Sequence, residues 1–384
     1  MKIKLKEKTE HIELVKAMGS RDNEASREAM RVFANLVGPL AKKVLDETNA
    51  IDGFYDTLSV GEYEPRTIPL DDYHNISNAD YVRVSFSSRP GDLAYNQLTG
   101  ADDVAFSTAF ISSAIAYYKK YLKAGRINHA ENGIRKMINE VRFKMKRQGI
   151  QPILDSLANT TTNGGKHLIR ANTPNQLGLD DFNRLQTMAA RILTSGLGDT
   201  PAGIDNSTRA VDTLVMSPEM VEEIRAIAYQ PMNTRAAVGT ADKDSTGIAA
   251  PEGVRESVYA AGGIPSIYGT EIIQLNEMGI GQDFNTIFDT LAGSTEYPDA
   301  GEAFDSSSTT AFAGSTDEFV LGISRQIDVN GLLKVEIADG ETGANFNVSP
   351  DDQFVAREGK TGMFGEAEVG YLAVEPRNLF GLIV

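Results

Sequence analysis

One long helix constrains the fold more than any other feature of this sequence. Residues 127–158 place apolar side chains within about a third of the helical wheel, which is typical of a helix packed along one side. The apolar positions are Ile134, Met137, Ile138, Val141 and Met145. An adjacent basic face carries Arg135, Arg142 and Lys146. We expect the apolar stripe to pack on a sheet while the charge faces outward, and Gly149 or Pro152 to end or bend the helix.

The charge is divided unevenly along the chain. Residues 119–147 hold ten Lys or Arg against two acids, a net charge of +8, whereas residues 241–350 hold 18 acids against four bases, a net charge of −14. Two ordinary solvated faces would account for this division. The alternative is a protein whose two sides meet different surroundings, one of them polyanionic.

The composition excludes several classes of protein. A chain of 384 residues with 41% hydrophobic content predicts two or three folding units and is too apolar for a disordered or fibrous protein. The absence of Cys excludes disulfides, thiolate metal sites and thiol nucleophiles. Neither a membrane-spanning window of ~18 apolar residues nor a signal-peptide core is present. We therefore expect a soluble protein made in a cytoplasm.

The first third of the chain predicts an arm, a helix and an extended excursion. Residues 1–21 are charged and weakly patterned, and a helix is expected to begin near Asp22, with a kink or a division at Gly38-Pro39. Residues 58–110 then suggest a long two-stranded excursion, because no continuous apolar face accompanies them. Its best strand alternates strictly over Tyr81, Val82, Arg83, Val84, Ser85 and Phe86. An isolated hairpin is marginal in water, so this strand needs a partner to lie on.

Beyond residue 178 the pattern is mixed α and β. Ser217 is expected to cap a helix over residues 220–229, with Pro218 in its first turn. Residues 291–317 are rich in Gly, Ser, Thr and Asp and predict a surface loop. A further amphipathic helix is predicted at residues 182–193. Strands are predicted at residues 213–216, 319–323, 332–337 and 366–374.

Searches for catalytic chemistry find little. Gly164-Gly165-Lys166-His167 lacks the spacing of a phosphate-binding loop. Residues 242–247 copy the first half of a calcium loop, but Gly253 stands where the bidentate Glu is required. The four His are dispersed, and no pair of carboxylates is marked out for acid–base work. We expect no catalytic, cofactor-binding or metal-binding residue and no cofactor.

The second half of the sequence resembles the major capsid proteins of tailed bacteriophages, which have the Hong Kong 97-type (Johnson) fold. No single stretch carries this resemblance, which depends on several segments in the right order. The segments are residues 213–234, 250–259, 268–273, 281–285 and the C-terminal residues 364–380.

The resemblance implies an α+β capsid fold with an N-terminal arm, an extended E-loop, a P-domain containing the long spine helix, and an A-domain. The corresponding ranges are 1–57 for the arm, 58–110 for the E-loop, 111–178 for the P-domain, 179–340 for the A-domain and 341–384 for P-domain return strands. It further implies that the chain assembles with itself into the pentamers and hexamers of a virion capsid, within the host cytoplasm. The strand over 81–86 would lie on a neighbouring subunit, and Arg135, Arg142 and Lys146 would face packaged DNA through non-specific electrostatics.

Two departures from the family limit what the resemblance implies. Some members begin with a scaffolding segment that is removed, and none precedes the arm here, so scaffolding would be a separate protein or is missing from this chain. Some members also crosslink an E-loop Lys to a neighbour, but residues 44–118 contain no Lys. Portal and decoration proteins are further possible partners, and no membrane is expected.

Three functions stay open at this point. The leading one is a structural capsid protein of a phage with a double-stranded DNA genome. The second is the shell protein of a cargo-holding nanocompartment with the same fold, which the +8 of residues 119–147 disfavours. The third is a soluble α+β enzyme, for which an intact cluster of perturbed pKa values in a closed pocket would be needed.

Overall fold

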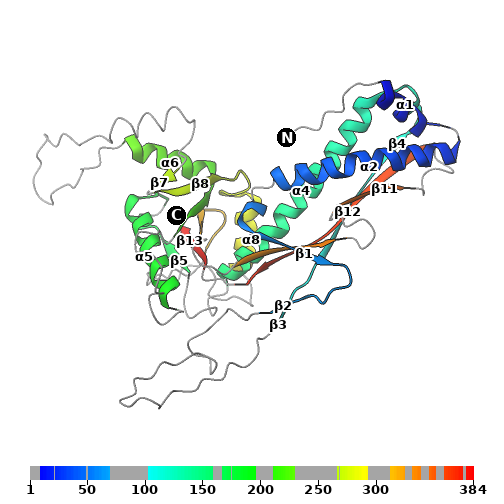
Figure 1. Cartoon of the computed structure of the whole chain (residues 1–384). Coiled ribbons are helices and arrows are strands. Elements are labelled where there is room, and N and C mark those ends of the chain that lie inside the picture. The colour runs from blue at the N-terminus through cyan, green and yellow to red at the C-terminus, as the bar shows by residue number, and fades with distance from the viewer. Residues whose placement is uncertain are drawn as a thin grey trace, which may run out of the picture. The chain divides into compact units, whose positions relative to one another are not determined.

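The computed structural model describes most of the chain in segments. They are residues 9–20, 22–48, 51–69, 103–158, 167–173, 175–195, 211–229, 266–267, 269–292, 312–324, 331–338, 346–351, 359–374 and 378–384. These segments belong to two compact units (Figure 1). Unit 1 comprises the described residues within 1–69, 103–150 and 332–372, and unit 2 those within 151–331 and 373–384. The strand predicted at Tyr81–Phe86 lies outside the described residues.

Unit 1 combines helices with a five-stranded sheet and a separate two-stranded ladder. Its helices are α1 Thr9–Met18, α2 Asn23–Thr48, the short η1 Asp52–Phe54, α3 Lys119–Lys123 and α4 Ile127–Ala158, which continues into unit 2. Its strands are β1 Asp56–Gly61, β2 Thr67–Pro69, β3 Asp103–Ala105, β4 Ala109–Tyr118, β10 Leu332–Ala338, β11 Asn347–Asp351 and β12 Lys360–Ala373.

Strand β12 organises the five-stranded sheet. The strand order is β1-β10-β12-β11, and β4 also pairs with β12. Both β4 and β11 run antiparallel to β12, so Phe364 has Ala114 on one side and Ser349 on the other. Strand β1 joins the sheet through a parallel pairing with β10. This pairing differs from the predicted excursion over 58–110, because residues 58–61 are part of a sheet that the sequence pattern did not reveal.

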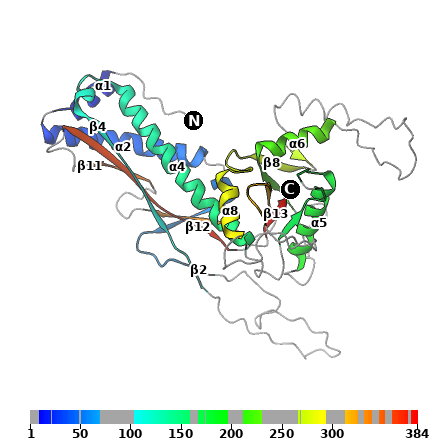
Figure 2. The same ribbon diagram turned by 180° about the vertical axis from the view of Figure 1, so that it is seen from behind.

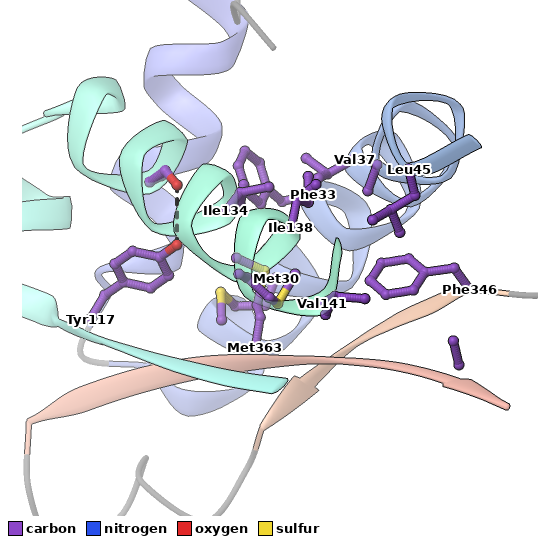
Figure 3. Packing of buried hydrophobic residues seen from close by; sticks show 14 of the residues in the cluster. Met30, Phe33, Val37, Leu45, Tyr117, Ile134, Ile138, Val141, Phe346 and Met363 are labelled. Carbon is purple, nitrogen blue, oxygen red and sulfur yellow. Dashed lines mark hydrogen bonds between the residues drawn. The ribbon is translucent and has the colours of Figure 1, made fainter. Parts of the chain in front are cut away.

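The core of unit 1 lies between α2, α4 and one face of this sheet (Figure 3). Ile134, Ile138 and Val141 of α4 pack beside residues of α2, and Met363 of β12 closes the cluster from below. The Tyr117 hydroxyl at the end of β4 donates a 3.1 Å hydrogen bond to the carbonyl of Ala130. Burying about five apolar side chains of one helix stabilises the fold by several kcal/mol, at ~1.5–3 kcal/mol each. The predicted apolar stripe and its packing on a sheet are confirmed.

Both helices continue through prolines at which the sequence predicts a kink or a division in α2, and a bend or an end in α4. Helix α2 is continuous through Pro39, and α4 continues through Pro152 to its end at Ala158. A proline removes one backbone hydrogen bond and crowds the preceding turn. In α2 the flanking Val37 and Ala41 are fully buried, so packing on both sides of Pro39 holds the helical course. In α4 a similar set follows Gly149, namely Ile150, Ile153, Leu154 and Leu157.

Unit 2 is a six-stranded sheet with helices on both faces. Its helices are α5 Leu179–Ser195, α6 Pro218–Tyr229 and α8 Asp283–Ala292. Its strands are β5 Leu168–Arg170, β6 Thr213–Met216, β7 Ser266–Ile267, β8 Thr270–Gln274, β9 Phe319–Ile323 and β13 Leu379–Ile383. The strand order is β5-β13-β9-β6-β8-β7.

The alternation of side chains along β9 separates the two faces of this sheet. Val320 points into a cluster with side chains of α5 and α6, whereas Phe319 stacks on Phe288 of α8 with ring centroids 5.0 Å apart. Figure 2 shows α5 and α8 on opposite sides of the strands. The predicted strand at 213–216 has the bounds expected, and the Ser217 hydroxyl accepts a 3.1 Å hydrogen bond from the Met220 amide, as a helix cap does.

The two compact units divide the chain at other residues than the ranges that the resemblance implies. The range 179–340 includes β10, which pairs with β1 and lies in unit 1. The range 341–384 includes β13, which pairs with β5 and β9 in unit 2. In both cases the partner strand is distant in the sequence, so a local pattern does not reveal it.

Candidate interaction surfaces

The basic face of α4 lies beside its buried stripe. Arg135 is exposed, and Arg142 and Lys146 are partly exposed, while Ile134, Ile138 and Val141 are buried. The Arg135 guanidinium donates a hydrogen bond to the Asn132 side chain one turn earlier. These bases can therefore keep their charge in water while the other side of the helix packs. An exposed basic stripe of this kind attracts polyanions in a salt-dependent way.

The two-stranded ladder of β2 and β3 leaves unit 1 from an apolar base. Thr67 pairs with Ala105 and Pro69 with Asp103, so the strands that carry residues 70–102 are held side by side. Beneath them, Phe106 packs with Val60 and two residues of β10 in a small cluster. Ile68 and Leu372 lie against the same cluster. The ladder is thus seated on the sheet rather than joined to it by a loose linker.

Glu368 of β12 ties both strands of the ladder to the sheet. Its carboxylate lies 2.7 Å from the Arg66 guanidinium, just before β2, and also accepts a hydrogen bond from the Thr108 hydroxyl, just after β3. The Phe106 amide donates a 3.1 Å hydrogen bond to the Arg66 carbonyl, which closes the base. We call Arg66, Thr108 and Glu368 the root triad. The Arg66 side chain is 48% exposed and that of Glu368 23%, so the ion pair adds only about 0–1 kcal/mol to stability, and its main effect is on geometry.

One face of the strands β4, β12 and β11 has no helix of unit 1 over it among the described residues. On β4 the outward positions alternate with the buried ones and are Phe110, Ser112, Ala114, Ala116 and Tyr118, all exposed. Most of these side chains are small, so a second chain can approach the sheet closely. The sequence pattern missed this strand because small residues hide the alternation of apolar and polar positions.

A second exposed apolar surface lies on α2. Phe33 and Val37 are buried, but Val32, Leu36 and Leu40 follow one another at successive turns on the exposed side. An exposed row of aliphatic side chains is typical of a surface that meets another protein.

A buried ionic network fixes the segment before β1. The Lys334 ammonium lies 2.8 Å from Asp52 and 2.6 Å from Glu336, and the Tyr371 hydroxyl donates a 2.9 Å hydrogen bond to the other oxygen of Asp52. Burial by itself would lower the pKa of Lys334, but the two carboxylates outweigh it and raise this pKa. Burial, with Asp52 nearby, raises the pKa of the Tyr371 and Tyr55 hydroxyls. These raised pKa values keep the Lys334 ammonium charged and the two hydroxyls neutral at neutral pH, so we interpret the network as structural.

Acidic side chains gather near the cap of α6 in unit 2. The Ser217 hydroxyl donates a 2.5 Å hydrogen bond to the buried Glu318 carboxylate. Burial raises the pKa of Glu318, its bond to Ser217 opposes this, and the charges of Glu219 and Glu223 raise it further. Within the described residues no group of three His, Asp or Glu could hold a metal ion. Helices long and apolar enough to cross a membrane are likewise absent from that part of the chain.

Comparisons with known proteins find structural likeness without sequence likeness. No protein-family model matches the chain, and none of the curated proteins does. The structure is similar to the capsid structure of the cyanophage P-SCSP1u (13% identity, TM-score 0.47, covering 86% of both chains). It is similar to a structure from Gordonia phage Cozz (12% identity, TM-score 0.45, 87% of this chain and 85% of that one). It is also similar to the SrpI encapsulin from Synechococcus elongatus PCC 7942 (9% identity, TM-score 0.41, 87% and 86%).

Proposed function

We propose that this chain is the repeating subunit of a closed protein shell, a major capsid protein of the Hong Kong 97 type that encloses double-stranded DNA. The observation that carries the proposal is the seated ladder of β2 and β3. Glu368 holds the base of this ladder on both sides, which supports the expectation that the E-loop of residues 58–110 is positioned to contact another subunit. The exposed faces of α2 and β4 supply surfaces on which copies of the chain can meet.

In this proposal the E-loop strand over residues 81–86 lies on a neighbouring subunit. The alternation from Tyr81 to Phe86 gives it one short apolar face, which a single hairpin cannot cover in water. Backbone amide exchange over this strand should therefore be fast in isolated subunits and slow in assembled shells. Equal protection in both states would mean that the strand packs within its own subunit.

Assembly itself is tested with the purified full-length chain. Electron micrographs and sedimentation should show closed shells of uniform size, and a monomer at every concentration and ionic strength would overturn the proposal. The ratio of nucleic acid to protein in shells taken from cells, measured after nuclease treatment, separates a genome capsid from a cargo-holding nanocompartment. Protected DNA supports the first, and shells that hold only protein support the second.

The root triad gives a sharper test of why the ladder matters. Glu368→Gln removes the ion pair with Arg66 but keeps an oxygen that can accept the hydrogen bond from Thr108. Glu366→Gln is a matched control, because it removes the same charge from the same strand two residues away. Glu368→Gln should leave the urea midpoint of the subunit within about 1 kcal/mol of the parent but lower the yield of closed shells. If both variants assemble like the parent, the ladder's geometry does not govern assembly.

The basic face of α4 is proposed to meet the packaged genome. Changing Arg135, Arg142 and Lys146 together to Gln should leave empty-shell assembly and melting nearly intact, because exposed charges add about 0–1 kcal/mol each to folding. DNA-filled particles should become less stable, and the difference should shrink at high salt. Failure of the triple variant to assemble without DNA would mean that these bases form ion pairs between subunits.

A further inference from the structure

Exposed aromatic rings gather where β4, α3 and α4 meet. Tyr118 ends β4, Tyr121 lies in α3 and His129 lies in the first turns of α4. The rings of Tyr121 and His129 stack with centroids 5.1 Å apart, and the edge of Tyr118 meets Tyr121 at 6.2 Å. Tyr118 is 56% exposed and Tyr121 42%. The core contact of this segment is made instead by the fully buried Leu122, so the rings are not required for packing.

Cations lie over these rings. The Arg126 guanidinium carbon is 5.9 Å from the centre of the Tyr121 ring, and the Lys360 ammonium is 5.4 Å from the centre of the Tyr118 ring. Aromatic faces attract cations and hold them in a preferred place. The same helix α3 that carries Tyr121 also carries three lysines, namely Lys119, Lys120 and Lys123. We call these rings and cations together the tyrosine–cation cluster.

The sequence around the cluster contains no balancing acid. Residues 119–129 hold four bases and no Asp or Glu, and Lys360 comes from β12 on the other side of Tyr118. One more base, Lys16 of α1, packs against Gly125 in the turn between α3 and α4. A Cβ at position 125 would lie only 3.0 Å from the aliphatic part of the Lys16 side chain, so the absence of a side chain there allows this contact. Gly125 has φ = 66°, a backbone conformation that favours glycine. Lys16 of α1 therefore lies against the turn that joins the lysines of α3 to Arg126.

We propose that the tyrosine–cation cluster binds the sugar–phosphate backbone of a nucleic acid. Bases from α1, α3, β12 and the turn before α4 offer several donors to successive phosphates, and Arg126 in particular presents a planar fork that matches phosphate oxygens. The exposed rings beside them give sugars and bases an apolar surface, as in many nucleic-acid grooves. This site goes beyond the proposed shell function, because it lies within one subunit and needs no assembly. It is also separate from the basic face of Arg135, Arg142 and Lys146.

The test uses the purified full-length chain and a fluorescein-labelled 20-base-pair duplex, with binding followed by anisotropy. Lys120→Gln, Lys123→Gln and Arg126→Gln are combined in one variant. The matched control combines Arg27→Gln, Arg31→Gln and Lys43→Gln, three exposed bases of α2. The cluster variant should bind the duplex at least tenfold more weakly at 0.1 M salt. Its slope of log affinity against log salt should fall by about 2–3, as loss of three phosphate contacts predicts, while the control stays near the parent.

A single change tests the rings. Tyr121→Leu keeps an apolar helix-forming residue but removes the face that holds Arg126, and it should weaken binding about threefold with an unchanged circular dichroism spectrum. Equal weakening by the cluster variant and its control would show general charge attraction and overturn the site. Competition by polyglutamate as strong as by unlabelled DNA would point to an acidic protein partner and overturn the choice of nucleic acid. Micrographs of the same variants report on shell assembly separately, so the two proposals can fail independently.

Discussion

Breaking the buried network around Lys334 should unfold the subunit more readily than almost any other single change in unit 1. The Lys334 side chain is only 3% exposed and those of Asp52 and Glu336 only 8%. Lys334→Met fills much of the same space but leaves two carboxylates close together in a poorly solvated place. Removing one partner of a buried pair costs about 3–5 kcal/mol, and each 1.4 kcal/mol is a factor of ten in the folding equilibrium.

The control for this prediction removes every charge at once. In Asp52→Asn, Lys334→Met, Glu336→Gln the Tyr371 hydroxyl can still donate to the amide oxygen at position 52, and no uncompensated charge remains. Replacing a whole buried network by neutral groups is often nearly neutral for stability, so the triple variant should recover most of the loss. Urea unfolding of dissociated subunits at pH 7, followed by circular dichroism, measures both. A single variant that loses under 1 kcal/mol, or a triple variant that is no better, would refute the reasoning.

Three further predictions concern unit 2 and the shell. The pKa of Glu318 is raised from its ordinary 4.5, so its contribution to stability is present at low pH and is lost as the pH rises through its pKa in the folded protein. Glu318→Gln should therefore raise the urea midpoint at pH 7 and leave it unchanged at pH 4. Gly381→Ala places a Cβ 2.2 Å from the Leu168 side chain and 2.7 Å from the Phe319 ring, so overpacking should cost about 1–3 kcal/mol, visible as a lower melting temperature. With no Cys and no Lys in residues 44–118, shells boiled in detergent without reductant should give monomers of 41.6 kDa, and a covalent ladder on the gel would contradict this.

The sequence was sufficient to predict those elements whose structure depends on consecutive residues. The bounds of α4 and β6 agree with those predicted, because a helical stripe and a capped strand–helix turn are written in consecutive residues. Of the outcomes expected at Pro39 and Pro152, the division of α2 and an early end of α4 are absent, because the burial of neighbouring side chains outweighs the local preference of proline to end a helix.

The pairings between distant segments could not be predicted in this way. The residues next to β1 in the sequence do not indicate that β1 pairs with β10. The residues next to Arg66 do not indicate that its ion-pair partner is Glu368. Only part of the tyrosine–cation cluster could be predicted from the sequence. The basic character of residues 119–129 is evident from their composition, but the stacking of Tyr121 on His129 depends on the turn between two helices. The exposure of Leu36 and Leu40 could not be predicted either, because a helical spacing does not say which side of the helix is covered.

The place of β13 between β5 and β9 has a consequence for how the chain is made. A ribosome delivers Leu168–Arg170 long before it delivers Leu379–Ile383, yet β5 is hydrogen-bonded to β13. While the intervening residues are being synthesised, β5 lacks this partner and β9 has an open edge, and pairings over such long separations are slow to form. Unit 2 can therefore complete its sheet only after translation has passed Ile383.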